Sequence, residues 1–218
     1  MTDVSDITLD PDRAARTGVP EIVYAPGKTV VQVGAAMSGL LAAGVAPVIA
    51  ARCSKEQAAS LMEVCPDVDI DGATVVARSL PANGLRVAVV TAGTADQVVA
   101  AEASATLRAF GFEVERINDV GVAGVHRLLE RVAELRRVDA LVVIAGMEGA
   151  LPTAVAGLVD TPLVAVPTST GYGSSFEGIT ALAAMTASCA PGVSVVGIDN
   201  GVGAACVVAR WLRVRARA

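Results

Sequence analysis

Short apolar runs alternate with helical patterns through the second half of the chain, and this alternation constrains the fold more than any other feature. Ala140–Ala145 is continuously apolar, as expected of a strand buried on both faces. Strand patterns occur at Arg86–Thr91, Phe112–Arg116, Ala140–Ala145, Leu163–Val166 and Val193–Ile198. Helical patterns occur at Asp96–Phe110, His126–Arg137, Phe176–Ser188 and Gly203–Val214. These units predict an α/β fold with a doubly wound parallel sheet and helices on both faces.

One of these helices is predicted to be clearly amphipathic. His126–Arg137 carries apolar residues at helical spacing. They are Leu128, Leu129, Val132 and Leu135. We therefore expect one face of this helix to pack on the sheet.

Before Leu85 the patterned segments are shorter and predict a smaller α/β domain. They are Glu21–Tyr24, Val30–Ala43, Val48–Ala51, Lys55–Val64 and Ala73–Ala77. Ser79–Gly84 is rich in turn-forming residues and favours a linker. The predicted domains are therefore residues 1–82 and 83–218, and the polar residues 1–18 are expected to be extended.

The uncharged segment Thr29–Ala51 is long enough to cross a bilayer. It contains three glycines and Pro47, however, and so predicts a helix, a turn and a strand. We expect no membrane association.

Charge and cysteine content exclude several classes of function. The 218-residue chain has a formal net charge of −5, and its one basic segment is Arg210–Arg217, which argues against nucleic acid as a partner. None of the 4 cysteines belongs to a C-x-x-C pair and there is 1 histidine, which argues against a zinc centre. The N-terminus lacks a basic-then-apolar leader, so we expect a cytoplasmic protein with reduced thiols.

Small-residue turns follow the predicted strands of the larger sheet. They are Ala92–Asp96, Asn118–Gly124, Gly146–Leu151, Pro167–Phe176 and Asp199–Gly203. In open parallel sheets, ligands bind at the carboxyl ends of the strands. Backbone N–H groups of such turns can face an anion. The turns therefore indicate a nucleotide or another phosphorylated ligand.

Two of these turns have a structural as well as a functional interpretation. In TAGTAD (Thr91–Asp96), Thr94 can cap the next helix with Gln97 as its capping-box partner. Alternatively, the turn cradles a phosphate or ribose that Asp96 contacts. In GYGSSFEG (Gly171–Gly178), phenylalanine occupies the place of the third glycine of a dinucleotide fingerprint, so a loop that closes over a ligand fits better.

Three side chains are candidates for catalysis. Glu148 lies in GMEGALP, where Pro152 suits the first turn of a helix. The helix dipole favours its negative charge by about 0.3–1 kcal/mol, but its position at a strand end also suits a base or a partner for a cation. Cys189 in TASCAPG is either a packing residue or a nucleophile that needs a cationic neighbour. His126 begins a helix, where a surface histidine is the simpler interpretation.

Together, these motifs resemble the LarB family, the carboxylase/hydrolase of nickel-pincer nucleotide cofactor biosynthesis. The segments that carry the resemblance are TAGTAD, DVGVAGVHRLLER, VVIAGMEGALPTAVAGLVDTPLVAVPTSTGYGSSFEG, SCAPGV and IDNGVGAA, with GVPEIVYAPGKT and SKEQAA nearer the N-terminus. The larger domain is also similar to the PurE type of aminoimidazole ribonucleotide carboxylase. This similarity implies a PurE-like, flavodoxin-like three-layer fold.

The resemblance implies an enzyme that carboxylates the pyridinium ring of nicotinic acid adenine dinucleotide with CO2 and hydrolyses its phosphoanhydride. The implied products are pyridinium-3,5-biscarboxylic acid mononucleotide and AMP. Cys189 is implied as the nucleophile, and Glu148 is our candidate for the carboxylate that handles the ring proton. A divalent cation such as Mg²⁺, no organic cofactor, and a homo-oligomer formed through the PurE-like domain are also implied. Substrate binding is expected from Thr91, Gly93, Thr94, Asp96, Asp119, Gly121, Gly124, Gly146, Met147, Gly171, Tyr172, Gly173, Asp199 and Asn200.

Departures from the family patterns bear on the alternatives. Ala187 stands where the family has asparagine, and Gly197 and Val202 depart from its NIDNGF block, which can alter ring positioning. The two PurE histidines have no counterpart, and Val122 aligns with one of them. This argues against an aminoimidazole ribonucleotide as substrate. A PurE-like carboxylase or mutase, and a nucleotide-binding module without catalysis, are the other two functions considered.

Overall fold

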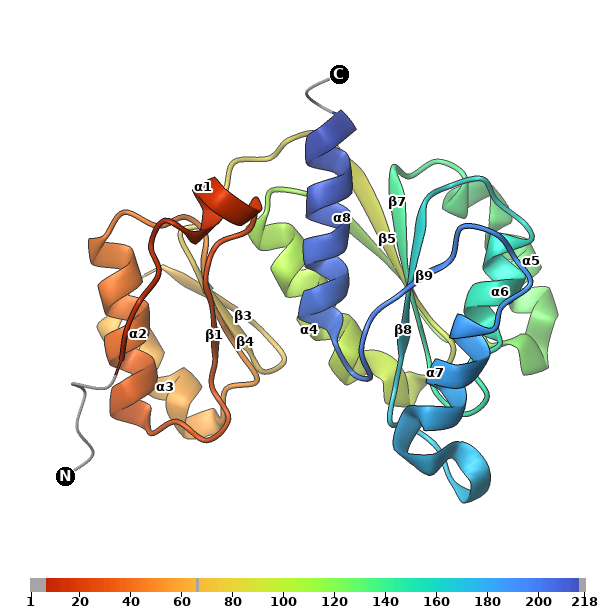
Figure 1. Cartoon of the computed structure of the whole chain (residues 1–218), viewed down its shortest axis with the longest axis horizontal. Helices are drawn as coiled ribbons and strands as arrows, with labels where there is room; N and C mark the ends of the chain where they lie inside the picture. Colours follow the sequence, from red (N-terminus) through yellow and green to blue (C-terminus); the bar gives the residue numbers. More distant parts are fainter. Residues whose placement is uncertain (1–6, 66, 216–218) are drawn as a thin grey trace.

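The computed structural model describes residues 7–65 and 67–215, which form two lobes, each with its own sheet (Figure 1). The larger sheet has 5 strands in the order β6-β5-β7-β8-β9, and every neighbouring pair is parallel. Its strands are β5 (Arg86–Thr91), β6 (Glu113–Ile117), β7 (Ala140–Ala145), β8 (Leu163–Pro167) and β9 (Ser194–Val195). This is the strand order of flavodoxin-like folds, and it confirms the predicted doubly wound parallel sheet.

Helices cover both faces of the larger sheet. The face toward the N-terminal lobe carries α4 (Gln97–Ala109) and α8 (Gly201–Arg215) (Figure 1). The opposite face carries α5 (Val125–Leu135), α6 (Leu151–Ala156) and α7 (Ile179–Thr186). The sheet is therefore the middle layer of three.

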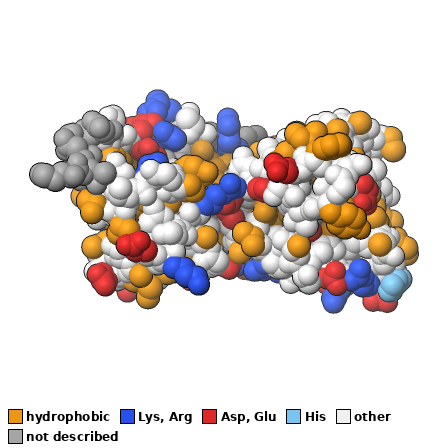
Figure 2. Space-filling view, turned by 90° about the horizontal axis from the view of Figure 1, so that it is seen from below, with side chains coloured by type: hydrophobic (Ala, Val, Ile, Leu, Met, Phe, Trp, Pro, Cys, Tyr) orange, Lys and Arg blue, Asp and Glu red, His pale blue; other side chains and the backbone are white. Residues whose placement is uncertain are grey.

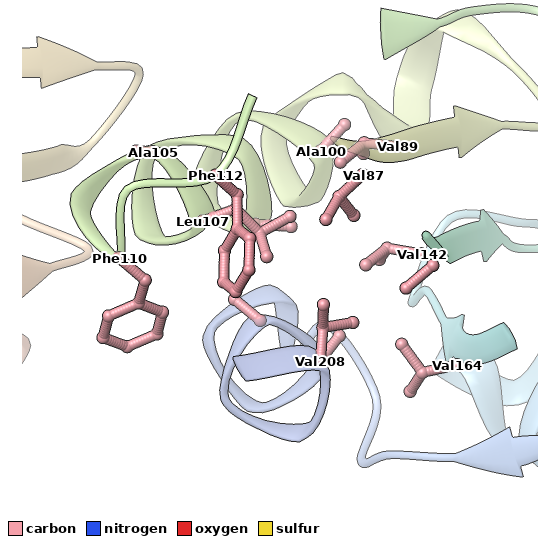
Figure 3. Packing of buried hydrophobic residues seen from close by; sticks show 14 of the residues in the cluster. Val87, Val89, Ala100, Ala105, Leu107, Phe110, Phe112, Val142, Val164 and Val208 are labelled. Carbon is pink, nitrogen blue, oxygen red and sulfur yellow. The ribbon is translucent and has the colours of Figure 1, made fainter. Parts of the chain in front are cut away.

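Each face of the larger sheet has its own apolar cluster. On the α4 and α8 side, Val87 and Val89 of β5 meet Leu107 of α4 and Val208 of α8 (Figure 3). The alternate residues of β5, Ala88 and Val90, belong to the cluster on the other face. This alternation follows from the pleat of a strand that is buried on both sides.

The smaller sheet has the order β1-β2-β4-β3 and is mixed. Its strands are β1 (Ile22–Tyr24), β2 (Val48–Ala51), β3 (Val68–Asp71) and β4 (Thr74–Ala77). Only β1 and β2 are parallel, whereas β4 pairs antiparallel with β2 and β3. The helices of this lobe are α1 (Arg13–Thr17), α2 (Val30–Ala42) and α3 (Lys55–Val64), and α2 and α3 both begin with capping boxes.

α4 packs between the two sheets, because it contacts β3 and β4 of the smaller sheet as well as β5 and α8. Alanines of α4 such as Ala100, Ala103 and Ala105 are buried, and their small side chains let both sheets approach closely. Ion pairs lie at the same junction, where Arg52 pairs with Glu102 and Arg108 pairs with Asp71. Figure 2 shows basic and acidic side chains together along the junction of the two lobes. The two lobes are thus joined through α4.

In the N-terminal lobe, two elements differ from the sequence prediction. Within residues 7–18, Arg13–Thr17 is helical and not extended, with Gly18 as its left-handed C-cap (φ 86°). The remainder of that prediction, residues 1–6, lies outside the described residues. β3 was not predicted, because its acidic alternation does not resemble a buried strand.

Thr29–Ala51 forms α2, a turn at Gly44 (φ 79°) and β2, as predicted. Within residues 7–65 and 67–215, no helix is long and apolar enough to cross a bilayer. The predicted boundary between residues 82 and 83 stays a prediction.

In the larger lobe, the helix predicted at Phe176–Ser188 begins later. Gly173–Gly178 forms a 3₁₀ segment (η4) in which Phe176 and Glu177 have φ of 44° and 51°, and α7 starts at Ile179. Left-handed residues cannot continue an α-helix. The predicted apolar face of α5 is also narrower, because Leu129 is 53% exposed.

Candidate active site

A cavity of about 260 Å³ opens at the carboxyl ends of β5, β7 and β8. Residues predicted for the site that line it are Gly93, Asp96, Gly121, Gly146, Met147 and Glu148. Thr170 and the 3₁₀ turn η3 (Val122–Gly124) contribute to its wall. The fold therefore brings together four turns that are far apart in the sequence.

Two positions in this cavity require glycine, because another backbone segment passes too close for a Cβ atom. A Cβ atom on Gly146 would lie 2.3 Å from the Thr170 carbonyl oxygen, and one on Gly121 would lie 2.8 Å from the Ala92 carbonyl oxygen. The next residue, Met147, has a left-handed backbone (φ 53°) and donates its N–H to the Thr170 oxygen at 2.8 Å. Several turn N–H groups thus hold the cavity together and are not available to a ligand.

Asp96 is the buried carboxylate of the cavity, with 2% of its surface exposed. It accepts hydrogen bonds from the Thr168 hydroxyl at 2.8 Å and from the Gly93 N–H at 2.9 Å. Burial raises the pKa of Asp96, and the nearby charge of Asp199 acts in the same direction, although the two hydrogen bonds oppose them. Asp96 therefore links the end of β5 to the turn after β8.

The predicted capping box of Thr94 and Gln97 is wrong. Gly93 precedes the 3₁₀ turn η2 (Thr94–Asp96), and the Asp96 carboxylate closes that turn by accepting from Gly93. Gln97 instead donates from its side chain to the Thr91 hydroxyl oxygen at 3.1 Å. Thr94 itself is exposed at the start of the turn.

Glu148 is exposed in the turn that precedes α6, and it lines the same cavity as Asp96. The N-cap of α6 is Ala150, and no side chain caps this helix. The turn is anchored on α7, because a Cβ atom on Gly149 would lie 2.9 Å from the Ala181 Cα. Glu148 is therefore held at the cavity without serving as a helix cap.

Cys189 is exposed in the loop after α7 and does not line the Glu148 cavity. Its neighbour Ser188 shares a hydrogen bond of 2.8 Å with Thr153 of α6. The segment that carries the thiol is thus fastened to the helix that follows Glu148, although the thiol itself lies outside the cavity in the single chain. Of the other cysteines, Cys53 and Cys65 are buried and Cys206 is partly buried.

Thr91 and Asp119 have structural contacts beside the cavity. The buried Thr91 hydroxyl accepts the Asp119 N–H at 3.2 Å. Asp119 has a left-handed backbone (φ 58°), and its carboxylate pairs with Arg127. Gly124 lies at the end of the same loop as the N-cap of α5, where His126 is exposed. These contacts fix the turn between β6 and α5.

Asp199 and Asn200 lie in the turn after β9. Asp199 accepts the Ser169 N–H at 2.8 Å. Asn200 accepts the Gly203 N–H at 2.6 Å and so caps the start of α8. Neither residue lines the Glu148 cavity, and several other predicted binding residues also lie outside it.

Gly171, Tyr172 and Gly173 form an exposed loop next to Thr170. Tyr172 is 80% exposed, and Phe176 in the same segment is 67% exposed. Gly171 packs against Ser175, since a Cβ atom there would lie 2.5 Å from the Ser175 Oγ. Apolar side chains left in solvent beside a cavity are consistent with the predicted covering loop.

Sequence reasoning missed Thr168, Arg52 and Glu102. Thr168 is the hydrogen-bond donor to Asp96, and its place in the turn after β8 could have indicated it. Arg52 comes from the N-terminal lobe and binds both the Glu102 carboxylate at 2.8 Å and the Asp199 carbonyl oxygen. Nothing local in the sequence marks Arg52, because its partners lie 50 and 147 residues away.

The expected divalent cation has limited support from these side chains. Among residues 7–65 and 67–215, no group of three His, Cys, Asp or Glu side chains could hold a metal ion. Mg²⁺ bound to a nucleotide needs only one or two carboxylates, because phosphates and water supply the other ligands. Asp96 and Glu148 are the two carboxylates that line the cavity, and the cation stays a prediction.

Known families match both lobes. Residues 1–79 match the LarB/PurE-like N-terminal domain, and residues 86–218 match the AIR carboxylase family. The chain is 37% identical over 209 residues to an uncharacterized protein of Methanocaldococcus jannaschii, covering 91% of this chain and 80% of that protein. It is 31% identical over 134 residues to the N5-carboxyaminoimidazole ribonucleotide mutase of the same organism, covering 59% of this chain and 80% of the mutase.

Proposed function

The chain belongs to the LarB family, with a PurE-like carboxylase domain, and from this premise we propose that it carboxylates nicotinic acid adenine dinucleotide. The reaction adds CO2 to carbon 5 of the pyridinium ring and hydrolyses the phosphoanhydride. The products are pyridinium-3,5-biscarboxylic acid mononucleotide, a precursor of the nickel-pincer cofactor, and AMP. The observation that supports this most is one cavity, at the strand ends of a carboxylase-type domain, lined by both Asp96 and Glu148.

The first step needs a nucleophile, because a pyridinium carbon is too electron-poor to attack CO2. The Cys189 thiolate adds to a ring carbon, and the ring becomes a neutral dihydropyridine whose enamine is nucleophilic at carbon 5. Carbon 5 then forms a bond to CO2, giving a carboxylate and restoring the positive charge on the ring nitrogen. The positive charge of the substrate supplies the cationic neighbour that the thiolate needs.

The second step removes the proton from carbon 5. Glu148 accepts this proton, the C–H electron pair returns to the ring, and the carbon–sulfur bond breaks to release the thiolate. The exposed position of Glu148 supports this role, because its carboxylate can approach the ring. α4 begins beside the cavity, and its N-terminal dipole suits the phosphate groups.

Cys189 lies outside the cavity in the single chain. Either the segment after α7 moves, or the proposed homo-oligomer supplies Cys189 from a neighbouring copy. Both arrangements are compatible with an exposed thiol whose segment packs on α6.

Purified protein with nicotinic acid adenine dinucleotide and labelled bicarbonate tests this function. We expect label in a mononucleotide product and release of AMP. Cys189→Ala should abolish incorporation, whereas Cys206→Ala, a matched thiol change in α8, should not. Full turnover by Cys189→Ala would contradict the nucleophile assignment.

The similarity to an aminoimidazole ribonucleotide mutase favours one second candidate. A PurE-like enzyme would convert N5-carboxyaminoimidazole ribonucleotide under the same conditions and leave nicotinic acid adenine dinucleotide unlabelled. A protein that binds nucleotides but converts neither substrate would be a binding module.

A further inference from the structure

A second cavity, of about 440 Å³, lies between the two lobes beside the candidate active site. The N-terminal lobe contributes Arg52 and Thr74, and the larger lobe contributes Val98 of α4 and Asp199 after β9. Ala95 and Thr170 line both this cavity and the Glu148 cavity. The two cavities are therefore neighbours that share a wall.

Size argues that the proposed substrate needs both cavities. The Glu148 cavity, at about 260 Å³, is smaller than the roughly 300–1,000 Å³ that drug-sized ligands occupy. A dinucleotide is at least as large as a drug-sized ligand, so the Glu148 cavity holds only its reacting half. Another cavity at the lobe junction, lined by Tyr24 and Asn200, shares no lining residue with the Glu148 cavity.

The chemistry of the interlobe cavity suits a nucleoside more than a phosphate. Arg52 is its cation, but Glu102 and Asp199 supply two carboxylates. The Arg52 guanidinium is held by Glu102 at 2.8 Å and by the Asp199 carbonyl oxygen, which leaves a planar group on which a purine can stack. Val98 offers an apolar wall that is 78% exposed. The Asp199 carboxylate can accept hydrogen bonds from ribose hydroxyls.

We infer that the interlobe cavity binds the purine nucleoside half of the dinucleotide while the pyridinium half reacts in the Glu148 cavity. This inference rests on the proposed function for its substrate. It gives the N-terminal lobe a direct part in substrate binding, through Arg52. The phosphates then lie near the shared wall at Ala95 and Thr170, next to the start of α4.

Titration calorimetry with AMP and with nicotinic acid mononucleotide tests the inference on the full chain. Val98→Glu narrows the interlobe cavity and adds a negative charge that repels the phosphate of AMP. Glutamate in the first turn of α4 is compatible with the helix dipole, so the helix itself should be preserved. Leu129→Glu on α5 is the matched control, because Leu129 is also exposed and lines neither cavity. We expect Val98→Glu to weaken AMP binding by about tenfold or more and to leave nicotinic acid mononucleotide binding unchanged.

Arg52→Asn gives a second, independent arm. Asparagine tolerates the left-handed backbone of Arg52 (φ 60°), so the change removes the guanidinium without adding backbone strain. It should also weaken AMP binding selectively. Wild-type protein that does not bind AMP, or equal AMP affinities in Val98→Glu and Leu129→Glu, would overturn the inference. The labelled-bicarbonate assay on wild type tests the proposed function separately, since AMP binding can be Val98-dependent whether or not carboxylation occurs.

Discussion

The Arg52–Glu102 ion pair should be one of the main polar contributions to the junction of the lobes. The Glu102 side chain is 9% exposed, and its carboxylate accepts from Arg52 Nε at 2.8 Å and from the Val202 N–H at 3.1 Å. The hydrogen bond to Glu102 raises the pKa of Arg52, and the charge of Glu102 adds to this, against burial. Removing the guanidinium leaves a buried carboxylate with only a backbone donor.

The exposure of the Arg52 side chain determines how much unfolding free energy its substitution should cost. Breaking a fully buried ion pair costs about 3–5 kcal/mol, whereas exposed pairs contribute about 0–1 kcal/mol. The Arg52 side chain is 39% exposed, so solvent screens the pair in part. We expect Arg52→Asn to lower the free energy of unfolding by about 1–3 kcal/mol. Glu102→Gln in the same chain should recover about half of this loss, because glutamine keeps an acceptor for the Val202 N–H without the buried charge.

Urea unfolding of wild type, both single variants and the double variant gives the coupling energy. The matched control is Arg131→Asn, because Arg131 pairs with Glu134 at 2.9 Å on the surface of α5. The control should cost no more than about 0.5 kcal/mol. A zero coupling energy for Arg52 and Glu102, or equal losses for Arg52→Asn and Arg131→Asn, would refute the reasoning.

Three further predictions concern the site and the thiols. Glu148→Gln should slow single-turnover carboxylation by about 10²–10⁴-fold and let the Cys189 adduct accumulate. The melting temperature should change little. Near-native turnover of this variant would show that Glu148 takes no part in the chemistry. Because burial raises the pKa of Asp96 above 3.8, the folded chain keeps this proton to higher pH than the unfolded chain. Stability should therefore fall from about pH 4 upward as the pH passes through the raised pKa, and Asp96→Asn should flatten that fall in urea midpoints measured across pH. Burial raises the pKa of Cys53 and of Cys206 to about 11, so iodoacetamide at about pH 8 should modify Cys189 first, as peptide mass spectrometry would report.

Most of the fold was predictable because its signals are local. The capping box of Ser54 and Gln57 identifies α3, and the predicted Lys55–Val64 has the observed bounds. Continuous apolar runs identify β7 and β8 because both faces of a parallel sheet are covered. β3 escaped prediction because its carboxylates are stabilised by distant partners, such as Arg108 beside Asp71.

Residues of the candidate site were predictable only where they lie in a turn that directly follows a predicted strand. Gly146 and Glu148 follow β7, and the rule for parallel sheets places their turn at the ligand edge. Arg52 could not be predicted in this way, because its role depends on how the N-terminal lobe packs on α4. The capping role of Asn200 is local and was still assigned to substrate, since asparagine in a small-residue turn suits both.

The two carboxylates of the Glu148 cavity differ in how they are held, and this difference favours separate roles for them. Both oxygens of Asp96 are occupied, one by the Thr168 hydroxyl and the other by the Gly93 N–H. A carboxylate that joins two turns cannot move toward a ring carbon without breaking those turns, so we propose that Asp96 acts as a positioning residue. Glu148 has no hydrogen bond or ion pair with any residue in the ranges 7–65 and 67–215, and it does not cap α6. We therefore propose that its carboxylate, and not that of Asp96, approaches the substrate and receives a proton. Losing Asp96 should then raise KM and reduce stability, whereas losing Glu148 should reduce kcat alone.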